Sequence, residues 1–240
     1  MTNLCASNRA LTFLIGALLW GGGAWAAPAA TITHMSGTLA AMKPDGSTRV
    51  LALQSEVESG ETISTQKDTF ARLKFSDGGE VVLRPDSVFK IEGYNFNQEQ
   101  PKQDSFFARM VKGGARFVTG LIGKRDDRNA YGVRAATATI GIRGTQYVVL
   151  VCPGASCSPG MKDGAYTLVF EGSINVHNEF GEITCGAGQI CFTPLDGAPI
   201  LLPEIPAGVD FTPPPSFLDR IGSDAVLDTE GNQECAIGAP

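Results

Sequence analysis

Hydrophobic and polar residues alternate in short runs along most of the chain, and polar turns that contain glycine separate these runs. The alternation is clear in residues 49–53 and 70–75, and further short strand-like runs follow at residues 166–170 and 174–178. A hydrophobic period of two is typical of half-buried β-strands. The pattern therefore predicts an all-β domain of short strands, many of them joined as hairpins.

Glycine-centred turns recur through this region at irregular intervals, which excludes a strict repeat protein. Short strands with frequent turns are typical of a β-sandwich or of a β-solenoid-like coil of stacked antiparallel strands. We expect one of these two arrangements. The one short helix that we expect inside the domain lies at Phe117 to Ile122. The turns are centred on Gly46, Gly60, Gly78, Gly93, Gly113, Gly172, Gly181, Gly188 and Gly197.

The amino-terminal segment differs from the rest of the chain. Residues 1–9 form a short polar stretch with one arginine, residues 10–19 are apolar, and Ala24-Trp25-Ala26 has the small-x-small pattern of a cleavage site. The apolar run is too short to span a bilayer. The segment is therefore predicted to be a secretory signal peptide cleaved after Ala26, with no membrane anchor left after cleavage and a periplasmic or secreted product.

The composition changes again after Leu202, where prolines become frequent at Pro203, Pro206 and residues 213–215. Such a segment has few residues with which to build a core of its own. We expect residues 203–240 to be a proline-rich, partly disordered tail that either lies on the domain or stays mobile. The predicted organisation is a signal peptide (residues 1–26), a β-domain (residues 27–202) and this tail.

The charge balance is acidic. The 240 residues include 19 Lys and Arg and 25 Asp and Glu, which gives a formal net charge of −6. Removal of the signal peptide takes away Arg9 and no acid, so the mature chain has 18 basic and 25 acidic residues and a net charge of −7. Nucleic acids and anionic lipids require clustered cations. We expect neither as a partner.

Five cysteines remain after cleavage. In an exported protein, disulfides are the default state of cysteines. Cys152 and Cys157 bracket one loop, and Cys185 and Cys191 bracket a glycine turn, so each pair can close locally, although a crossed pairing remains open. We predict two disulfides and a single unpaired thiol at Cys235. Zinc is not expected, because neither histidine has ligand spacing to a cysteine, and no cofactor is predicted.

The stretch Thr137–Leu150 (TATIGIRGTQYVVL) is the most distinctive in the chain, with Gly141, Arg143, Gly144 and Thr145 at its centre. Two glycines in a β-branched run predict an extended chain that bends. Arg143 could bind a ligand carboxylate through two parallel hydrogen bonds, or it could tie the chain internally at the bend. We favour the internal tie, at a seam between the amino-terminal hairpins and the carboxy-terminal strands.

Nothing in the sequence has the spacing of a catalytic motif. The nucleophile elbow, the phosphate-binding loop and the paired-histidine zinc motif are all absent from it. His34 and His177 lie far apart in strand-like runs, and Cys157 has Cys152 as a disulfide partner rather than a role as nucleophile. We therefore expect no enzymatic activity. An envelope carbohydrate-active protein stays open as an alternative, because the carboxylate pair of a glycosidase has no fixed spacing.

Seven short pieces of the chain form a pattern when they are taken in order. The pieces are GETIST (60–65), ARLKFSDG (71–78), VVLRPDS (81–87), GGARF (113–117), ATIGIRGT (138–145), EGSINV (171–176) and GAGQ (186–189). Together they resemble the periplasmic domain of the ferric citrate regulator, the FecR domain, from about Val57 to Gln189. The resemblance implies an all-β domain of stacked, coiled antiparallel strands without enzymatic activity. In founding members this domain relays the occupancy of an outer-membrane transporter across the inner membrane to a sigma factor.

The chain departs from the layout of those founding members at its amino terminus. It has a predicted cleavable signal where they have a cytoplasmic anti-sigma segment and a membrane span. We therefore expect an exported, non-enzymatic FecR-like module that senses or binds an envelope protein or a cell-surface ligand. The alternative is an accessory regulator that acts in trans on a transporter and sigma-factor signalling system.

Overall fold

The computed structural model describes residues 28–125, 127, 129–154, 157, 160–209, 211–214 and 217, and the predicted signal peptide lies outside this range. Within it, strands run from Ala30 to Leu202, and the two helical turns are 3-10 turns. The strands are β1 (Ala30–Met35), β2 (Leu39–Met42), β3 (Thr48–Leu51), β4 (Glu56–Val57), β5 (Thr62–Thr65), β6 (Ala71–Phe75), β7 (Glu80–Leu83), β8 (Val88–Asn95), β9 (Ser105–Val118), β10 (Tyr131–Ala135), β11 (Ala138–Cys152), β12 (Gly164–Asn178), β13 (Gly181–Gly186), β14 (Ile190–Pro194) and β15 (Ile200–Leu202), and the turns are η1 (Pro101–Gln103) and η2 (Ile122–Lys124).

Three strands, β9, β11 and β12, are far longer than the others, and each contains a glycine with positive φ. These are Gly113 (φ +74°), Gly144 (φ +53°) and Gly172 (φ +76°). The two halves of each strand pair with different neighbours. The first half of β9 pairs with β8 and β10, whereas its second half pairs with β7 and β11. The glycines thus let three continuous strands pass from one layer of the fold to another.

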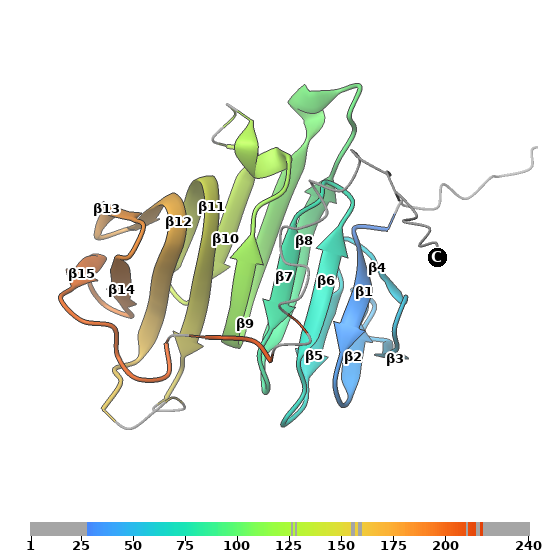
Figure 1. Ribbon diagram of the computed structural model, residues 1–240, viewed down its shortest axis with the longest axis horizontal. Coiled ribbons are helices and arrows are strands. Elements are labelled where there is room, and N and C mark those ends of the chain that lie inside the picture. Colours follow the sequence, from blue (N-terminus) through green and yellow to red (C-terminus); the bar gives the residue numbers. More distant parts are fainter. Residues whose placement is uncertain are drawn as a thin grey trace, which may run out of the picture.

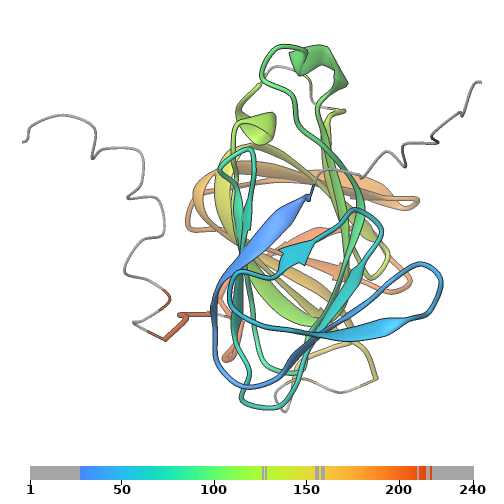
Figure 2. The same ribbon diagram turned by 90° about the vertical axis from the view of Figure 1, so that its right-hand side faces the viewer.

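The result is one continuous hydrogen-bonded sheet folded into two layers along the long axis of the molecule (Figure 1). Layer A consists of β4, β1, β6, β7, the second halves of β9 and β11, the first half of β12, β14 and β15. Layer B consists of β3, β2, β5, β8, the first halves of β9 and β11, β10, the second half of β12 and β13. The view along the long axis shows the strands wrapped around a common interior (Figure 2).

The predicted class, all-β with stacked and coiled strands, is confirmed. One pairing departs from the antiparallel pattern, because β10 runs parallel to the first half of β9, with Tyr131 opposite Phe106. After β9 ends, the chain passes through η2 and begins β10 beside the start of β9. The helix expected at Phe117–Ile122 is wrong: Phe117 is paired on both sides, with Val81 and Tyr147, and the 3-10 turn begins only at Ile122.

The main core lies between the two layers and contains two pairs of stacked aromatic rings. The rings of Phe117 and Tyr147 stack at 4.9 Å, and those of Phe106 and Tyr131 stack at 4.7 Å. The buried hydroxyls of Tyr131 and Tyr147 lie 2.8 Å apart and satisfy each other by a hydrogen bond. Burial raises the pKa of both phenols above the ordinary value, so both remain neutral.

A second apolar cluster lies on the outer face of layer A. It contains Val148, Leu150 and Tyr166, and the carboxy-terminal segment covers it with Val209, Phe211 and Phe217. Strands buried on both faces have continuous hydrophobic runs, which explains the sequence YVVLVC at the end of β11. The described part of the predicted tail therefore lies on the domain. No helix in the described ranges is long and apolar enough to cross a membrane.

Candidate functional site

β11 bends at Gly144, where the sequence predicts a seam. Hydrogen bonds between Thr145 and Thr119 stabilise this bend. The register with β12 shifts between Arg143 and Gln146. The Thr145 backbone N–H donates to Thr119 Oγ1 at 2.9 Å, and both the backbone N–H and the hydroxyl of Thr119 donate to the Thr145 carbonyl at 3.1 Å. Thr145 is 4% exposed, and its own hydroxyl has no partner within the described part of the chain.

Arg143 is exposed on the outer face of layer B. The expectation that it ties the seam internally is therefore wrong. Neighbouring strand residues point to opposite faces, and Ile142 packs against the main core, so Arg143 must point outward. Gly144 and Thr145 shape the bend, Gly141 lines a surface hollow, and the four predicted residues do not converge on one ligand.

Replacement of Arg143 with alanine should leave the melting temperature unchanged, because an exposed side chain contributes no more than about 0.5 kcal/mol to stability. Thermal unfolding followed by circular dichroism checks this. Thr119→Ala, which removes the hydroxyl that bridges to Thr145, is the matched variant that should melt earlier. A large loss of stability in Arg143→Ala would instead show that this side chain ties the chain internally at the bend.

A hollow of about 390 Å³ lies on the outer face of layer B. Gly132 and Gly141 leave its floor without side chains, and the ring of Phe107, which is 40% exposed, lies against Gly132. Arg134 and His177 stand among its remaining lining residues. A flat floor beside an exposed aromatic ring can hold an apolar or planar group of a ligand.

The charges next to this hollow are largely paired. Arg109 Nε lies 2.7 Å from Glu92 Oε1, and Arg134 Nε lies 2.9 Å from Glu92 Oε2. Partial burial of Glu92 opposes its ionisation, but the hydrogen bonds from the two arginines outweigh burial and lower the pKa of the carboxyl. Arg134 is thereby held by Glu92 rather than left as a clamp for an anionic ligand.

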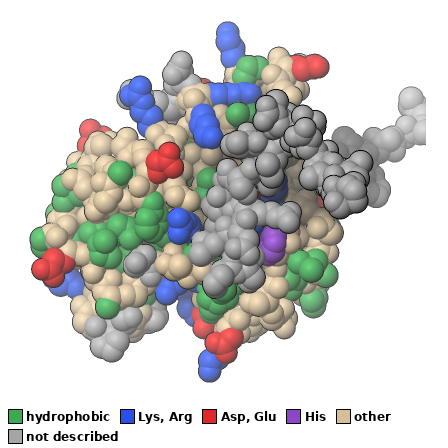
Figure 3. Space-filling model, in the orientation of Figure 1, with side chains coloured by type: hydrophobic (Ala, Val, Ile, Leu, Met, Phe, Trp, Pro, Cys, Tyr) green, Lys and Arg blue, Asp and Glu red, His purple; other side chains and the backbone are tan. Residues whose placement is uncertain are grey.

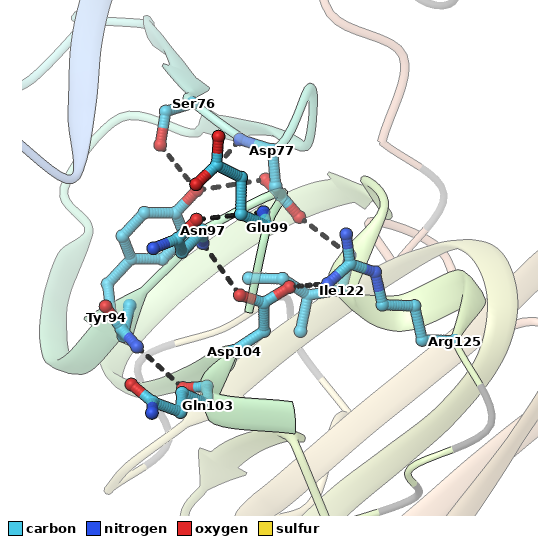
Figure 4. A network of polar contacts seen from close by, with 10 residues as sticks. Ser76, Asp77, Tyr94, Asn97, Glu99, Gln103, Asp104, Ile122 and Arg125 are labelled. Atoms are coloured by element: carbon cyan, nitrogen blue, oxygen red, sulfur yellow. Dashed lines mark hydrogen bonds and ion pairs between the residues drawn. The ribbon is translucent and has the colours of Figure 1, made fainter. Parts of the chain in front are cut away.

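A polar network joins the turn after β6, the end of β8 and η2 (Figure 4). Asp77 accepts hydrogen bonds from the Gly79 and Ile122 backbone N–H groups, at 3.0 and 3.2 Å, and from the Tyr94 hydroxyl at 3.3 Å. Burial raises the pKa of Tyr94, so its phenol stays protonated and able to donate. Asp104 is paired with Arg125. The carboxylates of Asp77 and Asp104 are both engaged by the protein, so we interpret the network as structural.

Among the described residues, the two histidines lie apart from each other and the four cysteines are paired in disulfides. His34 lies beside Phe217, with ring centroids 6.0 Å apart, whereas His177 lines the hollow on layer B. The described ranges contain no group of three or more His, Cys, Asp or Glu residues that could hold a metal ion. Of the pairings left open by the sequence, the structure has the two local ones, Cys152–Cys157 and Cys185–Cys191.

Proteolytic mapping without reduction should yield these two local pairs, because both hairpins hold their cysteines close; the Cα atoms lie 5.4 Å and 6.3 Å apart. Mass spectrometry of the peptides is the measurement. A peptide that joins Cys152 or Cys157 to either cysteine of the second hairpin would contradict the structure. Three or more free thiols in the denatured mature chain would rule out two disulfides. Cys235 lies outside the described residues.

Phe107, which lines the hollow on layer B, was not predicted from the sequence as a site residue. In the structure, Phe106, Ala108 and Met110 are buried, whereas Phe107 and Val111 are exposed. The alternation from Phe106 to Met110 was the available signal. It could not show that the glycines of β10 and β11 lie beside Phe107, since these strands are distant in sequence.

The bent strands around an apolar interior define an all-β module with two hollows on its surface. Residues 61–175 of the chain match the family model described as FecR protein. The resemblance predicted from the seven sequence pieces is thereby confirmed. The strands extend beyond the matched region at both ends, to Ala30 and to Leu202.

Among solved structures, two crystal structures described as an anti-sigma factor from Parabacteroides distasonis are similar, at 17% and 16% identity and a TM-score of 0.44 each. Each comparison covers 59% of this chain, and the chain spans 58% of the length of those structures. A structure described as a cell surface anchoring domain matches 25% of this chain and 80% of its own at 31% identity, with a TM-score of 0.25. No curated protein matches the chain.

Proposed function

We propose that the protein is an exported, non-enzymatic module that senses or binds a protein or a cell-surface ligand at the cell envelope. The observation that carries the proposal is the FecR domain at residues 61–175. The family's periplasmic role supports it, and the two disulfides fit an oxidising compartment. The engaged carboxylates of the polar network favour binding over catalysis.

Photo-crosslinking in intact source cells tests the proposal. A crosslinking amino acid placed at exposed positions such as Phe107 and Leu201 should capture a specific envelope component. The same group at the buried position Phe89 is the matched control and should capture nothing. Absence of any specific adduct, together with hydrolysis of an envelope glycan by the purified protein, would support the carbohydrate-active alternative instead.

A second function, regulation in trans of a transporter and sigma-factor system, is favoured by the same domain match. Under this function, the chain would bind a component of such a system without itself carrying the anti-sigma segment. Deletion of the gene should then change the expression of neighbouring transporter genes. Unchanged expression in the deletion strain would count against regulation in trans and leave the binding module standing.

A further inference from the structure

The carboxy-terminal end of the fold presents open sheet edges. Within the described residues, β15 pairs only with β14, and β13 pairs only with β12. Each strand therefore leaves one row of backbone N–H and C=O groups without a strand partner. Natural proteins protect such an edge by keeping the strand very short or by placing a charged residue or a proline on it. β15 is short, with three residues, but its sequence ILL contains no charged residue or proline.

Exposed apolar side chains gather at the same end. Five of the eleven large hydrophobic residues exposed in the described ranges lie there: Phe180, Leu195, Ile200, Leu201 and Ile205, all between 43% and 51% exposed. Figure 3 shows an apolar patch on the side where β14 and β15 lie in Figure 1. Contiguous apolar surface beside an open edge marks an interaction site.

A hollow of about 550 Å³ adjoins this edge, where the chain turns away from β14 after β15. Ile190, Leu202 and Ile205 contribute apolar lining, and Glu204 contributes a carboxylate. The hollow can therefore take an apolar side chain with a cation next to it. We call this hollow, together with β15 and the exposed residues around it, the carboxy-terminal edge site.

The chain segment that forms this end is acidic. It has no lysine or arginine between Lys162 and Arg220. The acids exposed around β13 and β15 are Glu179, Glu182, Asp196 and Glu204. These exposed carboxylates attract basic partners and repel acidic ones.

We propose that the carboxy-terminal edge site binds an extended segment of another protein, which adds as a strand to β15. The segment has apolar side chains at alternate positions, which fill the hollow beside Ile190, and lysine or arginine between them, which meet Glu204 and Asp196. Backbone hydrogen bonds to an open edge supply affinity, and alternate side chains supply specificity. This proposal rests on the proposed binding function and names its site and the chemistry of the partner.

A blocked peptide of alternating lysine and valine tests the site by NMR on the mature chain. Amide shifts should change at Ile200–Leu202 and through Ile205. A glutamate–valine peptide should bind at least about tenfold more weakly, because the surface repels it. The lysine–valine peptide methylated on alternate backbone nitrogens should not bind, because it cannot complete the ladder. Absence of binding, equal binding of all three peptides, or shifts confined to the Phe107 hollow would each overturn the proposal.

Matched variants separate this site from general attraction to an acidic protein. Leu201→Lys and Glu204→Lys should each weaken peptide binding at least about tenfold, whereas Val50→Lys, at an exposed strand position at the other end of the fold, should not. Self-association of the wild type that Leu201→Lys abolishes would make a second copy the occupant and overturn the proposed partner. A partner crosslinked equally in wild-type and Leu201→Lys cells would refute this site alone and leave the binding function intact.

Discussion

Replacement of Gly172 with alanine is expected to lower the free energy of unfolding by about 3 kcal/mol or more, through backbone strain and overpacking together. Gly172 has φ +76°, a region that side chains with a Cβ rarely adopt. A Cβ there would clash with the Gly144 carbonyl oxygen and would lie 2.9 Å from Thr145 Cγ2 and 3.1 Å from the Arg143 carbonyl oxygen. These atoms belong to the seam, so they cannot move without disturbing β11.

Gly188 supplies the control for this variant. Its φ is +78°, close to that of Gly172, but a Cβ there would meet nothing within 4 Å. Gly188→Ala should therefore show the conformational cost alone, about 1 kcal/mol. Chemical denaturation of both variants measures the difference. Equal losses would mean that the contact between the bends of β11 and β12 does not stabilise the fold.

Replacement of Glu80 with glutamine should cost about 3–5 kcal/mol, because it removes the charge partner of a buried arginine. Arg72 Nε and Nη2 lie 3.0 and 2.5 Å from the two carboxylate oxygens of Glu80, and the side chains are 3% and 6% exposed. The buried guanidinium would then face a neutral amide in place of the carboxylate that accepts its two hydrogen bonds. Denaturant unfolding at neutral pH is the measurement.

The exposed pair of Arg134 and Glu92 is the matched comparison. The Arg134 side chain is 52% exposed, so Arg134→Gln should cost less than about 1 kcal/mol. Joint replacement of Arg72 with methionine and Glu80 with leucine should recover much of the loss, since buried ion pairs are often no better than well-packed apolar residues. If Glu80→Gln unfolds like the wild type, the pair is not buried in solution.

The sequence predicted those features of the fold that depend on local residues. Hairpin turns such as Asp77-Gly78-Gly79 and the alternation of the strands fixed the class and most of the strand positions. Alternation alone did not show that both faces of β6 are buried. Leu73 and Phe75 lie in the main core, whereas Arg72 is buried on the opposite face with Glu80.

Features that depend on contacts between distant segments could not be predicted. The parallel pairing of β9 and β10 arises from the path through η2, and the packing of Phe211 and Phe217 on layer A gives no signal in a proline-rich sequence. The bend at Gly144 was predicted from its own residues. The need for a glycine at position 172 became visible only with the register of β11 and β12.

The candidate sites also contain some features that local residues predict and others that depend on contacts between distant segments. The cysteine spacing predicted that Cys152, Cys157, Cys185 and Cys191 form two disulfides, but only the hairpins select the local pairing. Arg143 was misplaced because a single cation between glycines does not show which face of the strand it occupies. The carboxy-terminal edge site combines residues of β14, β15 and the segment after them, and its open edge appears only once the strand order is known.

The central claim, an exported binding module, is tested most directly by fractionation of source cells followed by intact-mass measurement of the chain. The account predicts recovery from the periplasm or the medium of a chain that begins at Ala27 and contains two disulfides. Recovery of the full-length, reduced chain from the cytoplasm would contradict both the export and the disulfides on which the account depends.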